Sequence, residues 1–200
     1  NGIYLPMEIM PPRLGEAVLG LRALNFTGVN VTIPYKQKVI PFLDELSPEA
    51  QACQAVNLIR HSEGRLIGYN TDGQGFIASL REEGIDRLSR VIIIGAGGAA
   101  RSVVYELAQA GATRVDILDL LPERADALAE FVNQATPGSA VGHLMDQAVF
   151  AELCPATDLV VNCSPVGMHP AIDRSPVNSL QGLNPEAVVY DLIYNPPATK

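Results

Sequence analysis

The stretch VIIIGAGGAARSVVYELAQAG, residues 91–111, decides the fold class of this 200-residue chain. Its first four residues are apolar and strand-like, a glycine-rich turn follows, and apolar residues then recur at helical spacing until Gly111. A strand, a GxGxxG/A turn and a helix in this order are typical of a unit that binds a dinucleotide. The stretch therefore predicts a Rossmann-like α/β domain.

Each small residue of the turn has a separate task in this interpretation. Gly95 permits the tight turn, Gly97 lets a pyrophosphate approach the backbone, and Ala100 lets the helix pack on the strand. The helix N-terminus adds amide donors and partial positive charge. The alternative is a glycine-rich packing turn without a ligand. We expect cofactor contacts from Gly95, Ala96, Gly97, Gly98 and Ala99.

An acidic residue stands where such a unit would bind the adenosine ribose. Asp119 ends the next strand-like run, and its carboxylate can accept hydrogen bonds from ribose hydroxyls. It would also repel a 2′-phosphate, and neither Leu120 nor Leu121 is a cation, although Arg124 could partly compensate. The sequence therefore favours NAD over NADP. The alternative role for Asp119 is a helix N-cap.

Strand and helix patterns continue to alternate on both sides of this stretch. Residues 113–119, 140–145, 158–164 and 187–194 read as strands, and residues 121–134 as a helix. This alternation predicts a parallel sheet covered on both faces.

The first half of the chain predicts a smaller α/β domain with shorter elements. A helix is expected from Pro11 to Leu24, a strand at 28–34, and a helical segment at 36–47 interrupted at Pro41. Two strands should surround a Ser-Glu-Gly turn within residues 55–70, before a helix at 75–84. We expect a substrate-binding domain at residues 1–75, followed by the dinucleotide-binding domain at residues 76–200.

Composition narrows the class of partner. The chain is 48% hydrophobic with a net charge of −8, which argues against nucleic acid or an anionic membrane, and it has no membrane-spanning run. Three cysteines without CxxC spacing indicate reduced thiols in a cytoplasmic protein, and three scattered histidines give no reason to expect a metal. No pattern indicates an oligomeric state.

Three polar residues of the first half are candidates for chemistry. Lys36 follows a strand and a proline turn, Asn57 ends a strand-like run, and Asp72 lies in GYNTDGQGF, residues 68–76. Taken singly they read as a solvated lysine, a turn residue and a helix cap. An enzyme that oxidises an alcohol with a nicotinamide must move a proton as well as a hydride, and a lysine beside a carboxylate can do so.

Six short motifs follow one another along the chain: NVTIPYK (30–36), AVN (55–57), GYNTDGQGF (68–76), GAGGAA (95–100), NCSPVGM (162–168) and YDLIYNP (190–196). In this order they resemble the motifs of the shikimate dehydrogenase family, which includes quinate/shikimate dehydrogenases. The resemblance runs over nearly the whole chain and implies reversible hydride transfer between NAD or NADP and a ring hydroxyl of shikimate or quinate.

The resemblance also implies roles for individual residues. Lys36 would be the catalytic acid/base and Asp72 its partner, while Gly73 and Gly75 would keep the backbone compact. Substrate contacts would come from Thr32, Asn57 and Tyr194, and further cofactor contacts from Ser164 and Leu192 beside the nicotinamide.

This sequence departs from the family pattern in three places. The N-terminal serine motif and the C-terminal helical segment are absent from these 200 residues, so we expect a fragment of a longer protein. Asp119-Leu120-Leu121 replaces the usual Asn-Arg-Thr cluster. Two alternatives stay open: another two-domain dehydrogenase, such as one acting on a folate, and a non-catalytic nucleotide-sensing module.

Overall fold

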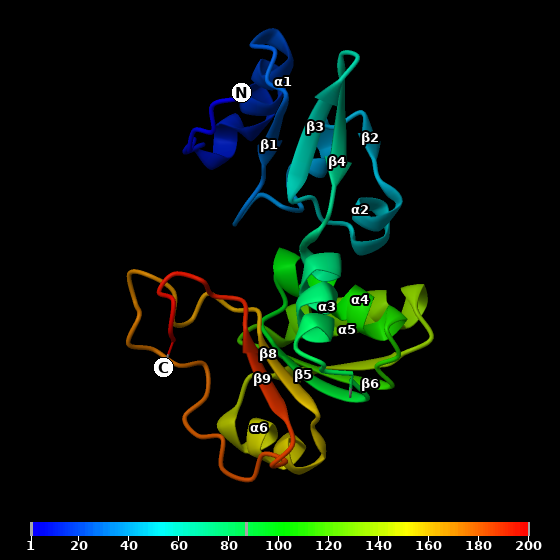
Figure 1. Cartoon of the computed structure of the whole chain (residues 1–200), viewed down its shortest axis with the longest axis vertical. Helices are drawn as coiled ribbons and strands as arrows, with labels where there is room; N and C mark the ends of the chain where they lie inside the picture. The colour runs from blue at the N-terminus through cyan, green and yellow to red at the C-terminus, as the bar shows by residue number, and fades with distance from the viewer. Residues whose placement is uncertain (1, 87, 200) are drawn as a thin grey trace. The chain divides into compact units, whose positions relative to one another are not determined.

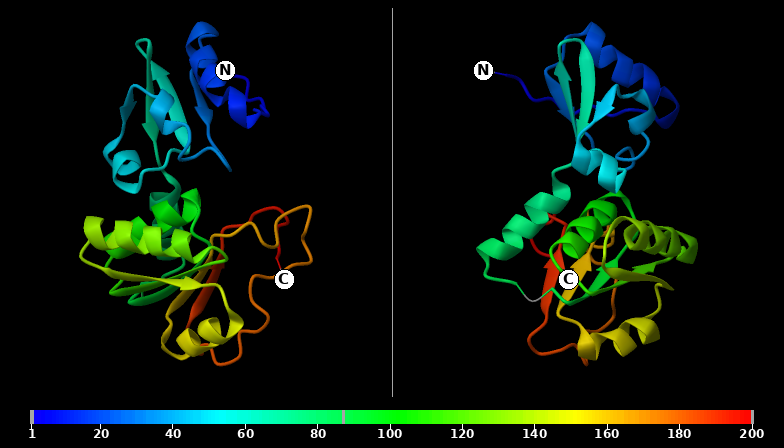
Figure 2. Two further views of the ribbon diagram at one scale, coloured as in Figure 1. Left: turned by 180° about the vertical axis from the view of Figure 1, so that it is seen from behind. Right: turned by 90° about the vertical axis from the view of Figure 1, so that its right-hand side faces the viewer.

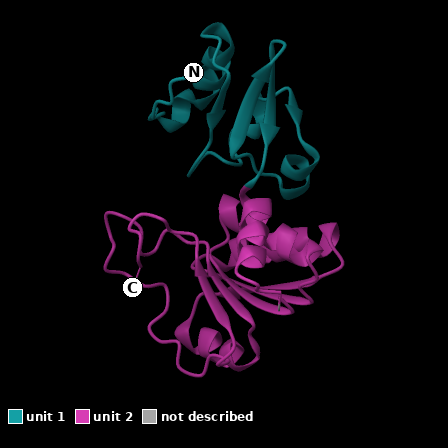
Figure 3. Cartoon of the chain, viewed as in Figure 1, with its two compact units in different colours: residues 1–71 teal, residues 72–200 magenta. Residues whose placement is uncertain are grey.

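The computed structural model describes residues 2–86 and 88–199 and divides into two compact units, shown in Figure 3. Unit 1 spans residues 1–71 and unit 2 spans residues 72–200. The expected boundary after residue 75 lies four residues further along, inside the first helix of unit 2.

Unit 1 is a small mixed sheet with two short helices and two 3₁₀ turns. Strand β3 is antiparallel to β1 and to β4, β2 is parallel to β4, and the strand order is β1-β3-β4-β2. The elements are η1 (Pro11–Arg13), α1 (Leu14–Ala23), β1 (Gly28–Asn30), η2 (Ile40–Phe42), β2 (Glu45–Leu46), α2 (Pro48–Cys53), β3 (Leu58–Ser62) and β4 (Arg65–Tyr69).

The core of unit 1 forms because α1 and the hairpin each present one apolar face. Leu14, Val18 and Leu21 recur every three to four residues on α1 and are buried in one cluster with Ile59 and Leu66. The predicted Ser-Glu-Gly turn is confirmed: Glu63 (φ 52°) and Gly64 (φ 76°) both take the left-handed backbone conformation that a tight two-residue hairpin needs.

The expected strand at 28–34 is wrong in its second half. Strand β1 ends at Asn30, and the chain then turns, with the Tyr35 amide donating to the Thr32 carbonyl over 2.9 Å. Pro34 has no amide hydrogen for a sheet ladder, so the strand cannot continue through it.

The expected helical segment at 36–47 is also largely wrong. Only the 3₁₀ turn η2 forms around Pro41, and the two-residue strand β2 follows it. Helix α2 was not predicted, although Ser47 accepts a hydrogen bond from the Ala50 amide as its N-cap and Pro48 is its first residue.

Unit 2 is built around five parallel strands in the order β7-β6-β5-β8-β9 (Figure 1). This confirms the predicted parallel sheet and the α/β fold class. The elements are α3 (Asp72–Glu82), β5 (Arg90–Ile94), α4 (Gly98–Gln109), β6 (Arg114–Asp119), α5 (Pro122–Ala135), β7 (Ser139–Leu144), α6 (Gln147–Leu153), η3 (Cys154–Ala156), β8 (Leu159–Asn162) and β9 (Val188–Asp191).

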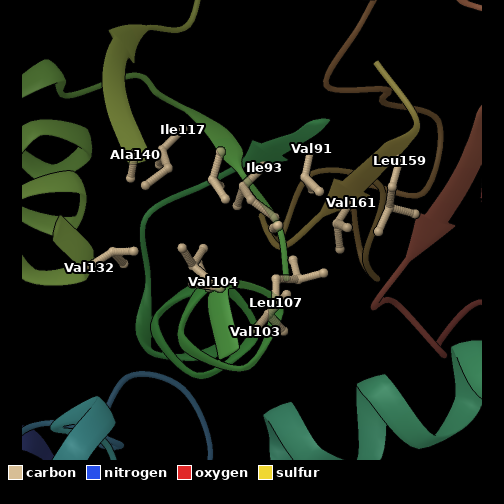
Figure 4. Close-up of a cluster of buried hydrophobic side chains, with 14 of the residues drawn as sticks. Val91, Ile93, Val103, Val104, Leu107, Ile117, Val132, Ala140, Leu159 and Val161 are labelled. Carbon is tan, nitrogen blue, oxygen red and sulfur yellow. The ribbon is translucent and has the colours of Figure 1, made fainter. Parts of the chain in front are cut away.

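Helices cover both faces of this sheet, as Figure 2 shows: α3, α4 and α5 lie on one face and α6 on the other. Val91 and Ile93 point into the first layer and pack with Val104 and Leu107 of α4 (Figure 4). The side chain of Ile92 points to the other face of the sheet and packs in a second cluster with Phe150 of α6. Helix α6 was not predicted. Strands buried on both faces explain the continuous apolar run before the glycine turn.

Helix α3 packs closely on α4 because Gly73 has no side chain. A Cβ at Gly73 would lie 2.5 Å from the Ser102 carbonyl oxygen and 2.6 Å from Cγ of Glu106. A Cβ at Gly75 would meet nothing within 4 Å, so no close approach of another segment requires glycine there. None of the described helices is long and apolar enough to cross a membrane.

Candidate functional site

The glycine turn joins β5 to α4 at the carboxyl edge of the unit 2 sheet. Gly95 has φ of +97°, and its amide donates to the Leu118 carbonyl over 2.7 Å, which fixes the turn against β6. A Cβ at Gly95 would lie 3.0 Å from the Ser164 amide nitrogen. Both the backbone angle and the crowding therefore require glycine at this position.

The start of α4 has the geometry that an anionic group needs. Gly97 precedes the helix, provides no side-chain cap, and has open space where a Cβ would be. Gly98 and Ala99 then open the helix, so the chain presents first-turn amides and the positive end of the helix dipole at one point. Such a terminus can bind a pyrophosphate.

Asp119 is tied to the glycine turn by its side chain. Its Oδ2 accepts a hydrogen bond from the Ala96 amide at 2.7 Å, and its Oδ1 accepts one from the Leu121 amide at 3.0 Å. Asp119 is not the N-cap of α5, since that position is Leu121. The helix-cap alternative is therefore wrong, and the carboxylate stands beside the turn.

Two arginines lie on the helices that follow the glycine turn and Asp119. Arg124 is in the first turn of α5, and its amide donates to the Leu121 carbonyl over 2.9 Å. The Arg101 guanidinium of α4 lies 3.8 Å from the centre of the Phe131 ring of α5, which ties the two helices together. Sequence reasoning did not single out Arg101.

The loops that follow β8 and β9 lie at the same edge of the sheet. Ser164 is two residues beyond β8, and its backbone borders Gly95. Leu192 donates its amide to the Asn162 carbonyl over 3.1 Å, so the chain after β9 begins beside the chain after β8. Tyr194 is 89% exposed. The structure therefore brings Ser164 and Leu192 to the strand ends that carry the glycine turn.

In unit 1, backbone hydrogen bonds gather the candidate residues at one end of the sheet. The Val31 amide donates to the Asn57 carbonyl over 2.8 Å, and the Val56 amide donates to the Lys36 carbonyl over 2.7 Å. Thr32 lies in the turn between these contacts. Lys36 is half-buried and Thr32 is exposed. Turn 31–36 and residues 55–57 are thus held against each other.

Asn57 is locked to the end of β4 by a reciprocal pair of hydrogen bonds. Its Nδ2 donates to Thr71 Oγ1 at 3.0 Å, and its Oδ1 accepts from the Thr71 amide at 3.1 Å. Asn70, buried beside them, donates to the Ala55 carbonyl at 2.9 Å. Asp72 follows Thr71 directly and is the first residue of α3 in unit 2.

Sequence reasoning missed Asn162 and Asp191, which are the last residues of β8 and β9. They pair in register, and the Asn162 Nδ2 donates to Asp191 Oδ1 at 3.2 Å. The available signal was a polar residue closing a strand-like run, VVN and VYD, because side chains at the carboxyl ends of parallel strands gather at one edge.

Comparison with known proteins agrees with both units. Residues 1–59 match the model of the shikimate dehydrogenase substrate binding domain, and residues 91–174 match that of the saccharopine dehydrogenase NADP binding domain. Over 98% of its length the chain is 53% identical to a shikimate dehydrogenase (NADP(+)) of Syntrophomonas wolfei, of which it covers 68%.

Solved structures of similar proteins include several with a bound dinucleotide, two of which contain NAD. Shikimate 5-dehydrogenase from Listeria monocytogenes, in complex with shikimate and NAD, is 32% identical with a TM-score of 0.86, over 99% of this chain and 70% of that one. Quinate dehydrogenase from Corynebacterium glutamicum, in complex with NAD, is 35% identical with a TM-score of 0.82, over 94% of this chain and 66% of that one.

The parallel sheet and its glycine turn define the class as dinucleotide-binding α/β proteins with a Rossmann-like domain. Within that class, the chain belongs to the shikimate dehydrogenase family. The resemblance drawn from the six motifs is confirmed, and the relatives favour neither a folate dehydrogenase nor a nucleotide-sensing module.

Proposed function

We propose that this protein catalyses reversible hydride transfer between a nicotinamide dinucleotide and a ring hydroxyl of shikimate, or of the closely related quinate. The observation that carries the proposal is the 53% identity to a shikimate dehydrogenase along 98% of the chain. It is supported by the glycine turn, which offers helix amides to a pyrophosphate, and by Asp119, a hydrogen-bond acceptor beside that turn.

Residues 72–200 bind the dinucleotide in this proposal. Gly95–Ala99 accommodate the pyrophosphate, Asp119 accepts from the adenosine ribose, and Ser164 and Leu192 border the nicotinamide. When bound, the dinucleotide accepts or supplies the hydride. The chain's own residues hold it and exclude water.

Residues 1–71, together with Asp72, supply the substrate side and the proton. Lys36 removes the proton from the substrate hydroxyl during oxidation and returns it during reduction, and Asp72 supports the lysine electrostatically. Thr32 and Asn57 donate and accept hydrogen bonds at the polar groups of the ring, and Tyr194 closes over the ring. The rigid bonding of Asn57 to Thr71 favours such a role, because a pre-organised amide loses little freedom on binding.

We propose NAD as the preferred cofactor. The Asp119 carboxylate is fixed by the Ala96 and Leu121 amides, so it cannot easily swing away from a 2′-phosphate, and Leu121 and Leu120 add no positive charge. Curated relatives at 40–53% identity are named for NADP(+), and solved neighbours were determined with NAD or with NADP+, so the proposal of NAD depends on Asp119.

A kinetic matrix tests the proposal. The full-length protein is assayed with shikimate and with quinate, each in the presence of NAD and of NADP, by the absorbance of the reduced nicotinamide. We expect turnover in at least one of the four combinations and a higher kcat/KM with NAD. No turnover in any combination, with dinucleotide binding intact by calorimetry, would remove the assigned reaction.

A further inference from the structure

Asn162 and Asp191 connect the two loops that the proposed function places beside the nicotinamide and the substrate. The two residues are register partners at the carboxyl ends of β8 and β9. Residues 163–187 and 192–199 contain no helix or strand among the described residues. Outside regular structure, side-chain hydrogen bonds decide where a backbone lies.

Asn162 uses both its amide oxygen and its amide nitrogen to shape the loop after β8. Its Oδ1 accepts from the Ser164 amide at 3.0 Å and from Ser164 Oγ at 2.7 Å, while its Nδ2 donates to the Val166 carbonyl at 3.3 Å. The same Nδ2 donates to Asp191. Asn162 is only 5% exposed, so we expect it to affect bound ligands by positioning the loop and not by direct contact.

Asp191 shapes the chain that follows β9. Its Oδ1 accepts from the Ile193 amide at 2.9 Å as well as from Asn162, and its Oδ2 accepts from Thr199 Oγ1 at 2.7 Å. The carboxylate thus ties the residues on both sides of Tyr194 to the end of β8. Two backbone bonds also join these segments, from the Leu192 amide to the Asn162 carbonyl over 3.1 Å and from the His169 amide to the Asn195 carbonyl over 3.2 Å.

The network ends at the glycine turn. Cys163 donates its amide to the Ile94 carbonyl over 2.8 Å, and the Ser164 backbone fills the space where a Cβ of Gly95 would lie. The Ser164 backbone therefore lies against the glycine turn, whose own conformation is held by the φ of +97° at Gly95 and by the bond from the Gly95 amide to the Leu118 carbonyl.

We propose that Asn162 and Asp191 form a positioning pair that sets the distance between the Ser164 loop and the Tyr194 segment, and thereby aligns nicotinamide and substrate for hydride transfer. This inference rests on the proposed function. The pair contributes through geometry, since a misplacement of about 1 Å can cost roughly a hundredfold in rate. The adenosine and pyrophosphate contacts at Asp119 and the glycine turn do not depend on it directly.

Asp191→Ala and Asp191→Asn separate this role from a general loss of stability. Alanine removes all three accepted hydrogen bonds, so we expect kcat to fall by about 10- to 100-fold. The dissociation constant for NAD, measured by calorimetry, should change less than about threefold, because the glycine turn and Asp119 are retained. Asparagine keeps an oxygen for Asn162 and Ile193, and its amide can donate to the Thr199 hydroxyl, so Asp191→Asn should recover most of kcat.

The matched control is Asp158→Ala at the opposite end of the same strands. Asp158 Oδ2 accepts from the Arg90 amide at 3.0 Å, so its loss also removes a carboxylate–backbone bond from this sheet. We expect Asp158→Ala to lower the melting temperature while leaving kcat unchanged. If Asp191→Ala melts too low to assay, Asp191→Ser, which keeps a small hydroxyl, takes its place.

Two outcomes would overturn the positioning role. One is an Asp191→Ala enzyme, or its serine substitute, with kcat within threefold of the native protein. The other is an Asp191→Asn enzyme as slow as Asp191→Ala, because hydrogen-bond geometry would then not be what the carboxylate supplies. An inactive native protein instead contradicts the proposed function, so the two failures are distinguishable.

Discussion

In unit 2 the glycine turn and Asp119 stand at the ends of strands buried on both faces, whereas in unit 1 Lys36 and Asn57 stand on segments that connect short strands. The β5 strand and the glycine turn are fixed by a continuous core and by backbone angles. Lys36 and Asn57 are placed instead by hydrogen bonds between these segments, such as the bond from the Val56 amide to the Lys36 carbonyl and the pair between Asn57 and Thr71.

This difference predicts that the two units tolerate different kinds of substitution. A site made from backbone amides is damaged by any side chain that enters it, while a site made from side-chain chemistry is damaged by the removal of one group. We therefore expect substitutions in unit 1 to lower activity mainly by removing a functional group. In unit 2 we expect them to act mainly by adding bulk or changing charge.

The largest expected effect is that of Lys36→Met. The substitution removes the acid/base but nearly preserves side-chain length, so kcat should fall by about 10²- to 10⁴-fold, the usual contribution of a positioned acid/base. The dissociation constant for NAD should stay unchanged. Steady-state kinetics with shikimate and calorimetry with NAD measure the two quantities.

Lys38→Met is the matched control, since Lys38 is an exposed lysine two residues further along the same segment. It should retain native kcat. A Lys36→Met enzyme that turns over like the native protein would show that the proton moves through another group.

Asp72→Asn should lower turnover less than Lys36→Met. The neutral amide cannot support the lysine electrostatically, but the acid/base itself remains. If the two residues act as one unit, the double variant should lose less than the product of the two single losses. Losses of kcat/KM that simply multiply would show that Asp72 and Lys36 work independently.

Gly95→Ala should weaken dinucleotide binding and destabilise unit 2. The new Cβ would have to occupy a backbone conformation at φ of +97° and would lie 3.0 Å from the Ser164 amide nitrogen. We expect a loss of about 1–3 kcal/mol in the free energy of unfolding. Denaturant titration and calorimetry with NAD measure the effects.

Gly111→Ala isolates the strain from the crowding. Gly111 has φ of +106°, but a Cβ there would meet nothing within 4 Å. It should lose stability through the backbone angle and keep its affinity for NAD. Equal loss of NAD affinity in both variants would contradict a specific role for the Gly95 turn.

The cofactor preference should change when charge at the end of β6 is changed. Asp119→Asn removes the negative charge yet keeps an oxygen for the Ala96 amide, and Leu120→Arg adds a group that can pair with a 2′-phosphate. The double variant should raise the ratio of kcat/KM for NADP to that for NAD by about tenfold, or about 1.4 kcal/mol. A native protein that already prefers NADP would refute the preference assigned to Asp119.

The sequence predicted unit 2 better than unit 1 for a physical reason. The apolar strands, the glycine turn and the order of strands and helices in unit 2 follow from local patterns, and β5, α4 and β6 lie where those patterns put them. The limits of β1 and the existence of β2 depend on hydrogen bonds to distant segments, such as that from Val31 to Asn57. No local pattern encodes such bonds.

The candidate site divides in the same way. Gly95 and Asp119 could be found from spacing, because their roles depend on the turn that contains them. Asn162 and Asp191 belong to different strands, and their partnership appears only when β8 and β9 are paired. Side-chain networks between strands are thus the part of this site that a sequence without a structure conceals.

The smallest expected effect lies away from the candidate site, at Asp116 on β6. Burial opposes ionisation of this carboxyl and is the largest single influence, but hydrogen bonds from Arg114 and His143 outweigh it, so the pKa of Asp116 is lowered. Because the folded-state pKa lies below the unfolded value of about 3.9, the ionised carboxylate stabilises the fold above that pH. The contribution is lost as the pH falls through the folded-state pKa.

Asp116→Asn should therefore cost about 1 kcal/mol of unfolding free energy at pH 7, the usual net contribution of such hydrogen bonds. The difference from the native protein should begin to shrink as the pH falls below about 4, where the carboxyl of the unfolded state becomes protonated, and should be lost once the pH has passed the lower folded-state pKa. Denaturant titrations at neutral and acidic pH measure it, with Glu130→Gln on the exposed face of α5 as the control. A difference that stays constant down to acidic pH would mean that the asparagine side chain disturbs packing and that charge is not the cause. Since Asp116 does not belong to the candidate site, kcat at pH 7 should not change, which separates the stability of the unit 2 sheet from the chemistry at its edge.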